Sequence, residues 1–241
     1  MPETMSYRQS LPLQPLDILR RAAAMGRTLV GVRHGGALLE RIGRFDGVRD
    51  DGGWMVAEDA AHVTRIHLGR VAASVADRSE TPHDTILAYV DLLDGEGRSL
   101  LKITALEGLD KLDAALDGLP RAPLPYVPPV ERSAVPVDDA DPGAAPLRAA
   151  QASGLPVTLS LTRPGAFQSR TGPITRVLIG HNYINVLEED LHLHLRGEQV
   201  MRWDVERRGA GVRWNAVGVD GEPYGLAIEG EEAAFAVPQP A

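Results

Sequence analysis

The sequence contains no cysteine. Without thiols the chain cannot form disulfides, thiolate metal sites or a cysteine nucleophile, so histidine, carboxylates and tyrosine remain as possible metal ligands. The same absence gives weak support for a reducing compartment. Aromatic residues are scarce, at 5% of the chain, and the three tryptophans lie in strand-like patterns, where they are more often packing residues than a platform for a cofactor.

Long apolar runs are absent as well. No stretch approaches the ~20 apolar residues that span a bilayer, and the N-terminal MPETMSYRQS lacks the basic and apolar regions of a signal peptide. Basic residues are outnumbered, with 25 Lys and Arg against 33 Asp and Glu and a net charge of −8. A nucleic-acid binder needs a contiguous basic face. We therefore expect a cytoplasmic protein that has neither a membrane nor a nucleic acid as a partner.

The common catalytic motifs are also missing. There is no GxGxxG after a strand, no Walker loop, no HExxH and no GxSxG. Dinucleotide binding, nucleotide binding, zinc-protease activity and serine hydrolysis therefore lack the residues that these functions need. Runs of acidic residues such as Glu188–Asp190 are most simply solvated turns.

What the chain does contain is an internal duplication. At an offset of 129 residues, LVGVRHGGALLERIGRFDGV (29–48) aligns with TLSLTRPGAFQSRTGPITRV (158–177). The same offset aligns residues 53–74 with 182–203 without a gap. Identities are few but the apolar pattern agrees, which indicates two copies of one structural unit. The aligned identical pairs are Gly36/Gly165, Ala37/Ala166, Arg41/Arg170, Gly43/Gly172 and Val48/Val177.

Each copy is predicted to begin with a short helix and to continue as strands. Residues 16–26 and 146–154 have helical spacing and end in glycine, and a further helix is expected over 106–119. The rest alternates with period two, which predicts antiparallel meanders of roughly six or seven strands. Asp94-Gly95 and Asp220-Gly221 predict two-residue hairpin turns. The last residues, 231–241, are expected to form a loose tail.

The predicted fold class is therefore α+β, with two tandem repeats, each a short helix followed by a large antiparallel meander, and with the sheets stacked. The first repeat is expected over 13–119 and the second over 146–230. Residues 120–145 form a linker, because eight of the 18 prolines lie between Pro120 and Pro146. Such a segment is expected to be an extended spacer that forms neither a sheet nor a long helix.

The stretch DLHLHLR (190–196) places a basic stripe on one predicted strand. Its leucines point to one face, while His192, His194 and Arg196 point to the other. The offset of 129 places Arg65 and His67 in the same way on the first repeat. The stripe is interpreted either as the solvated side of a sheet or as a surface that lines an anionic ligand. A zinc site made by His192 and His194 is disfavoured, because a closed site needs about four ligands and the neighbouring sequence supplies no further pair.

The run TRPGAFQSRTGPITRVLIGHNYINVLEEDLHLHLRGEQVMRWDVERR (162–208) resembles the second repeat of the bacterial haemin-degrading, haem-utilisation proteins of the HemS/ChuX type. VRHGGALLERIGRF, AEDAAHVTRIHL and YVDLLDGEGRSLLKI resemble the strands of the first repeat in the same order. The resemblance covers nearly the whole chain. It implies stacked antiparallel sheets flanked by helices, haem as ligand, and handling of haem for its iron in the cytoplasm.

Two arginines carry over from this family. Arg65 in VTRIHL matches the arginine that faces the iron side of the haem, and Arg208 in VERRG matches a basic position that meets a haem propionate. A guanidinium suits both roles because it is permanently cationic and binds carboxylates with two hydrogen bonds. A surface arginine without a function remains the alternative for each.

The departures from the family concern the iron ligand. The axial histidine of the family lies between the repeats, where this chain has the proline-rich linker and no histidine between His83 and His181. A second family histidine is Leu39 here, and Glu231 and Glu232 replace a C-terminal arginine that meets a propionate. The iron ligand, and thus the metal-binding residue, is therefore expected to be His194, with the alternatives His192, His67 and Tyr126.

Three functions follow from these observations. The first is a haem-binding protein of haem and iron utilisation, either a carrier or, with an external reductant, a factor that opens the ring of its own haem; a redox or haem-transfer protein would be its partner. The second is a family member that keeps the fold but binds another ligand or a protein. The third, an unrelated enzyme, has no motif that supports it.

Overall fold

The structure is a computed structural model, and it describes residues 6–78, 80–81, 85–128, 133–135 and 137–236. The chain divides into two compact units, which are described separately below. Unit 1 contains Met1–Val32, Arg41–Glu58 and Thr64–Arg132, and unit 2 contains Arg33–Glu40, Asp59–Val63 and Ser133–Ala241. Three strands therefore have one end in each unit: β2 (Arg27–His34), β3 (Ala37–Arg44) and β6 (His62–His67).

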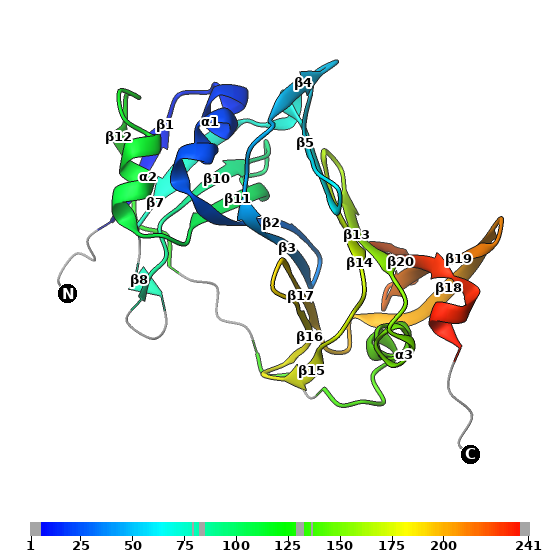
Figure 1. The fold of residues 1–241 in the computed structure, drawn as a ribbon. Coiled ribbons are helices and arrows are strands. Elements are labelled where there is room, and N and C mark those ends of the chain that lie inside the picture. Colours follow the sequence, from blue (N-terminus) through cyan, green and yellow to red (C-terminus); the bar gives the residue numbers. More distant parts are fainter. Residues whose placement is uncertain (1–5, 79, 82–84, 129–132, 136, 237–241) are drawn as a thin grey trace. The chain divides into compact units, whose positions relative to one another are not determined.

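Unit 1 contains a six-strand antiparallel group with neighbours in the order β12-β1-β7-β10-β11-β2, and its helices α1 and α2 both contact η1 (Figure 1). Its helical segments are α1 (Pro15–Arg21), η1 (Ala22–Met25), η2 (Leu68–Arg70) and α2 (Leu109–Ala115). Its strands are β1 (Arg8–Leu11), β2 (Arg27–His34), β4 (Arg49–Asp51), β5 (Trp54–Glu58), β7 (Ala73–Asp77), β8 (Glu80–Thr81), β9 (Thr85–Ile86), β10 (Tyr89–Leu93), β11 (Ser99–Ala105) and β12 (Ala122–Pro123).

The helices of unit 1 cover the core because their apolar residues recur at helical spacing. Ile18 and Leu19 of α1 and Leu112 of α2 are fully buried, as is Ile103 of the central strand β11. Burying one such side chain contributes about 1.5–3 kcal/mol, so these contacts stabilise the helices far more than helix propensity does.

Unit 2 contains two antiparallel groups of strands, β18-β19-β20-β13-β14 and β17-β16-β15, and the part of β3 that belongs to this unit adjoins β17. Helix α3 packs against η4 (Figure 1). The bounds of these elements are η3 (Pro142–Ala144), α3 (Ala145–Ser153), β13 (Val157–Arg163), β14 (Ala166–Gly172), β15 (Val177–Gly180), β16 (Tyr183–Leu187), β17 (Leu191–Arg196), β18 (Val200–Arg208), β19 (Gly211–Gly218), β20 (Pro223–Glu231) and η4 (Glu232–Phe235).

The register of β15 and β16 is set by a two-residue turn. His181 and Asn182 both have positive φ, 52° and 72°, between the paired residues Gly180 and Tyr183. Two positive φ angles define the hairpin turn whose twist matches that of the flanking strands, and asparagine tolerates this conformation well. The same register continues into β17 and places Asn185 directly opposite His194.

The predicted fold class, α+β with large antiparallel sheets, is confirmed, and every strand pair described within the two units is antiparallel. The three predicted helices are present, and Gly154 ends α3 in the left-handed conformation. The division into two sequence repeats stays a prediction. Among the described residues, no helix has both the length and the apolar character needed to cross a membrane.

Three local expectations were wrong. The linker over 120–145 was expected to form no sheet, but Ala122 and Pro123 pair with β1, at an edge where the missing N–H of proline costs nothing. Residues 129–132 and 136 of this linker lie outside the described residues.

The C-terminal tail was expected to be loose from residue 231, but it is ordered as far as Phe235, because η4 buries Ala234 and Phe235. Residues 237–241 are not described.

The two Asp-Gly turns were also expected to be shorter than they are. Both hairpins exist, but the loop after β10 covers residues 94–98 and the loop after β19 covers 219–222. Asp94 accounts for the first difference, because its carboxylate accepts hydrogen bonds from the backbone N–H groups of Glu96 and Arg98 and so closes a longer loop.

Candidate functional site

The basic stripe on β17 lies on a half-covered face of unit 2. Leu191, Leu193 and Leu195 are fully buried, whereas His192, His194 and Arg196 are intermediate in exposure. The predicted alternation of this strand is therefore confirmed. The polar face is not an open solvated surface, since other side chains of unit 2 cover part of it.

The imidazole of His194 is held by Asn185. The Nδ1 atom of His194 lies 2.7 Å from the Oδ1 atom of Asn185. The amide nitrogen of Asn185 faces three backbone carbonyl oxygens, those of Tyr183 at 3.1 Å, Leu178 at 3.3 Å and Gly180 at 3.5 Å. Because these acceptors fix which way the amide points, Oδ1 is the atom that faces the imidazole and Nδ1 carries the hydrogen. The other ring nitrogen, Nε2, points away from Asn185.

A carboxylate from β3 faces that second nitrogen. The Oε2 atom of Glu40 lies 3.4 Å from Nε2 of His194, and the side chain of Glu40 is only 13% exposed, against 30% for His194. The backbone beside Glu40 is anchored, because the fully buried Gln168 of β14 donates a hydrogen bond of 2.9 Å to the carbonyl oxygen of Leu39. Glu40 is thus directed at the histidines by a strand whose position is fixed.

His192 completes a cluster of three potential ligands. Its ring centroid lies 5.8 Å from that of His194, with the two planes at 80°. One ligand atom each of Glu40, His192 and His194 lies within 4.8 Å of the others. Burial lowers the pKa of His192 below its usual range, and the nearby His194 lowers it further, while Glu40 opposes the shift. His192 is therefore neutral near pH 7, the form that can donate an electron pair.

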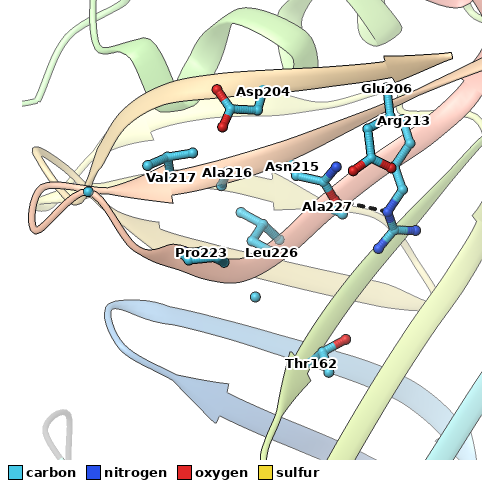
Figure 2. A pocket seen from close by; sticks show the side chains of 12 residues that line it. Thr162, Asp204, Glu206, Arg213, Asn215, Ala216, Val217, Pro223, Leu226 and Ala227 are labelled. Carbon is cyan, nitrogen blue, oxygen red and sulfur yellow. Dashed lines mark hydrogen bonds between the residues drawn. The ribbon is translucent and has the colours of Figure 1, made fainter.

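Unit 2 also contains a pocket of about 390 Å³, a volume within the range of small-molecule sites (Figure 2). Two carboxylates, Asp204 and Glu206, belong to its lining, and the guanidinium of Arg213 is already engaged by Asn215 at 3.0 Å and by Glu229 at 2.9 Å. The pocket is lined by Thr162, Asp204, Glu206, Arg213, Asn215, Ala216, Val217, Gly221, Pro223, Gly225, Leu226 and Ala227. Asp204 is paired with Arg202 at 2.9 Å and Glu206 with Arg208 at 3.1 Å, so each charged residue of the lining takes part in an ion pair.

The other residues expected at the site lie elsewhere. In unit 1, Arg65 is exposed on β6, and the half-buried His67 packs edge-on against Trp54 at 4.9 Å. Tyr126, also in unit 1, is 38% exposed. In unit 2, Arg208 is exposed at the end of β18 and pairs with Glu206 at 3.1 Å. Within unit 2, the structure brings together His192 and His194.

Glu40, Asn185 and the pocket were not predicted from the sequence. A zinc site was disfavoured because the neighbouring sequence supplies no further pair of ligands, and Glu40, a third potential ligand, lies in a distant part of the sequence. The alternation of β3 places Glu40 on the face opposite the fully buried Ala37 and Leu39, where its side chain is nevertheless only 13% exposed. A carboxylate at a partly buried strand position needs a partner.

Comparison with known proteins shows the fold. No family model matches the chain, and no curated protein matches it. Solved structures do. The heme-binding protein PhuS from Pseudomonas aeruginosa is similar with a TM-score of 0.74 and 18% identity, over 93% of this chain and 82% of that one. The heme degrading enzyme ChuS from Escherichia coli O157:H7 is similar with a TM-score of 0.75 and 17% identity, over 95% and 84%. The chain therefore has the fold of PhuS and ChuS.

Proposed function

We propose that this protein binds haem and acts in haem and iron utilisation in the cytoplasm. The observation that carries the proposal is the likeness in fold, over nearly the whole chain, to a heme-binding and a heme degrading protein. The sequence resemblance to the haem-utilisation family supports it independently, because that resemblance follows the order of the strands. Fold alone does not fix a ligand, so the side chains have to be tested for their fit to haem.

His194 is the proposed iron ligand. Its Nδ1 atom faces Oδ1 of Asn185, so Nε2 is the atom that would hold the iron. Glu40 opposes this role, because its carboxylate oxygen lies 3.4 Å from Nε2, where a bound haem would need room. His194 therefore fits haem only if the side chain of Glu40 turns away.

Arg65 and Arg208 are the proposed partners of the propionates or of a group bound to the iron. Both guanidinium groups are exposed, so a carboxylate can reach them. The ion pair between Arg208 and Glu206 occupies part of the guanidinium group, so fewer of its N–H groups can reach a propionate. A charge-assisted hydrogen bond from either arginine would contribute about 1.5–3 kcal/mol to binding.

Haemin titration tests this proposal. We expect a shifted Soret band that saturates at one haemin per chain, and a changed spectrum when His194 is replaced by Ala. The exposed His181 in the β15–β16 turn provides the matched control, and His181→Ala should leave the spectrum unchanged. Binding that never saturates, or a His194→Ala spectrum identical to that of the natural protein, would refute the assignment of His194.

The same complex distinguishes a carrier from a haem-degrading factor. Under air, ascorbate is added as the reductant, and the Soret absorbance is followed with catalase present. A degrading factor loses the Soret band and releases iron that a ferrous chelator detects. A carrier keeps its Soret band under these conditions. When apomyoglobin is added, the haem passes from the carrier to apomyoglobin.

The pocket in Figure 2 supports a second candidate function, a scaffold that binds a ligand other than haem. A cationic ligand there would compete with Arg202 and Arg208 for the carboxylates of Asp204 and Glu206. A thermal shift caused by a small diamine such as putrescine, reduced in Asp204→Asn and Glu206→Gln, would support this candidate. The absence of stoichiometric haemin binding in the same preparation would make it the better account.

A further inference from the structure

We infer that Glu40, His192 and His194 form a binding site for one divalent transition-metal ion. Among the described residues, this is the one group of at least three His, Asp or Glu side chains whose ligand atoms converge within 4.8 Å. The inference does not depend on haem, because it rests on the three side chains and on the residues that hold them. It goes beyond the proposed function in assigning a small inorganic ion to unit 2.

The separation between Glu40 and His194 fits two ligands of the same ion. Two donor atoms, each about 2.1 Å from a tetrahedral ion, lie about 3.4 Å apart. The Oε2 atom of Glu40 and the Nε2 atom of His194 are 3.4 Å apart. A direct charge-assisted hydrogen bond would instead bring the nitrogen and oxygen to about 2.7–2.9 Å. The observed distance leaves room for a cation between the two groups.

The orientation of the imidazole is the second argument. With Nδ1 directed at the Oδ1 atom of Asn185, Nε2 is the ring nitrogen of His194 that faces the carboxylate of Glu40. A divalent cation between the two groups would be bound by both of them. Histidines that bind metals usually donate their other N–H group to an oxygen of this kind, which fixes the tautomer and the ring direction.

The cluster is also built before any ion arrives. The backbone next to Glu40 is held by the hydrogen bond from Gln168 to the carbonyl oxygen of Leu39, and the amide of Asn185 is held by three carbonyl oxygens. His192 and His194 project from the same face of β17, whose leucines are fully buried. A site whose ligands are already oriented loses little conformational entropy on binding, which raises its affinity.

The donor set narrows the identity of the ion. Two imidazole nitrogens and one carboxylate oxygen suit Zn²⁺, Fe²⁺, Co²⁺ or Ni²⁺, whereas Mg²⁺ and Ca²⁺ prefer oxygen ligands alone. Three protein ligands leave at least one coordination position for water or another molecule. The arrangement therefore resembles open metal sites and differs from closed structural sites, which have four protein ligands.

Calorimetric titration of the untagged protein with ZnCl₂ tests the site, after the protein has been treated with a chelator and the chelator removed. We expect one Zn²⁺ per chain, and at least a tenfold loss of affinity in Glu40→Gln, which keeps the size of the side chain while removing its charge. His192→Ala and His194→Ala should lose at least as much. The controls are His181→Ala and Glu58→Gln, an exposed histidine and a glutamate on β5, and both should bind Zn²⁺ normally.

Visible absorption of bound Co²⁺ gives a second measurement of binding that does not rely on calorimetry. Co²⁺ at a site with two imidazoles and one carboxylate gives visible absorption bands, and Glu40→Gln should abolish or shift them. Circular dichroism establishes that each variant is folded. The absence of Co²⁺ and Zn²⁺ binding, or unchanged affinity in Glu40→Gln, would overturn the inference and leave at most weak binding by surface histidines.

The metal and haem proposals can fail separately. Glu40→Ala should weaken Zn²⁺ binding, whereas it should strengthen haemin binding if His194 is the iron ligand, because the carboxylate no longer occupies the space beside Nε2. Haemin binding without Zn²⁺ binding would refute the metal site alone. Zn²⁺ binding without haemin binding would refute the haem proposal alone.

Discussion

Asn185 and His194 are directly opposite each other in the β16–β17 pair, and their side chains are joined by a hydrogen bond of 2.7 Å. We predict that Asn185→Ala lowers the affinity for Zn²⁺ about 10–100-fold, the usual effect of removing the partner of a metal-binding histidine. Calorimetry measures this change. Asn215→Ala serves as the control, because Asn215 lies in the pocket and contacts Arg213. Equal losses in the two variants would count against a positioning role for Asn185.

Replacing Arg65 or Arg208 by Ala should weaken haemin binding by about 1–3 kcal/mol with little change in stability, since both side chains are exposed. Fluorescence quenching measures the affinity, and thermal unfolding the stability. Arg202→Ala is the matched control, as this exposed arginine of β18 pairs only with Asp204 in the contacts described for it. Unchanged haemin affinity in both variants would make them ordinary surface arginines.

Gly225 should tolerate no side chain. Its φ is +83°, and a Cβ atom there would lie 2.2 Å from the carbonyl oxygen of Thr162. Gly221 has the same φ but no atom within 4 Å of such a Cβ atom. We predict that Gly225→Ala lowers the free energy of unfolding by about 3 kcal/mol and Gly221→Ala by about 1 kcal/mol. Urea unfolding gives both values, and losses of equal size would show that the strand pair yields at Thr162.

Phe235 should stabilise unit 2 although it lies near the end of the chain. Its ring packs against that of Trp214 at 5.7 Å and is 8% exposed. Phe235→Ala is expected to cost about 3 kcal/mol of unfolding free energy. Val219→Ala, at a position that is 63% exposed, should cost less than about 0.5 kcal/mol. A Phe235→Ala variant as stable as the natural protein would mean that η4 does not contribute to the core.

The pKa of His192 should be lowered by the burial of its side chain. Burial and the proximity of His194 hold its pKa below the usual value of about 6.5. The unfolded chain therefore binds a proton at higher pH than the folded one, so stability is lost as the pH falls below about 6.5. NMR titration in the presence of a chelator should give a midpoint for the His192 imidazole below that of histidine in an unstructured peptide. His192→Gln should reduce the loss of stability at acidic pH, and an unchanged loss would assign it to other groups.

The local pattern of the sequence predicted much of this fold. The alternation in β17 and the glycine stops of η1 and α3 depend on neighbouring residues, which a sequence displays directly. β1 was not predicted, because Arg8–Leu11 has no apolar alternation and becomes a strand only through its partners β7 and β12. Phe235 was misjudged for a similar reason, since its burial depends on Trp214 of another strand.

The candidate site was predictable only in part. His192 and His194 are visible as a spaced pair, and their common face follows from strand geometry. Glu40 could not be paired with them from the sequence, because the contact depends on β3 lying beside β17. Asn185 is likewise defined by the register that the His181–Asn182 turn imposes.

The origin of Glu40 in a different part of the chain from His192 and His194 ties ion binding to the folding reaction. In the unfolded chain the three ligands are far apart, so an ion can bind all of them only after β3 has paired with β17. An ion that binds the folded state alone raises stability with its concentration, by about 2.7 kcal/mol at 100 times its dissociation constant. Metal supply would then govern how long β3 stays docked, and hence how readily a protease can cut the chain there.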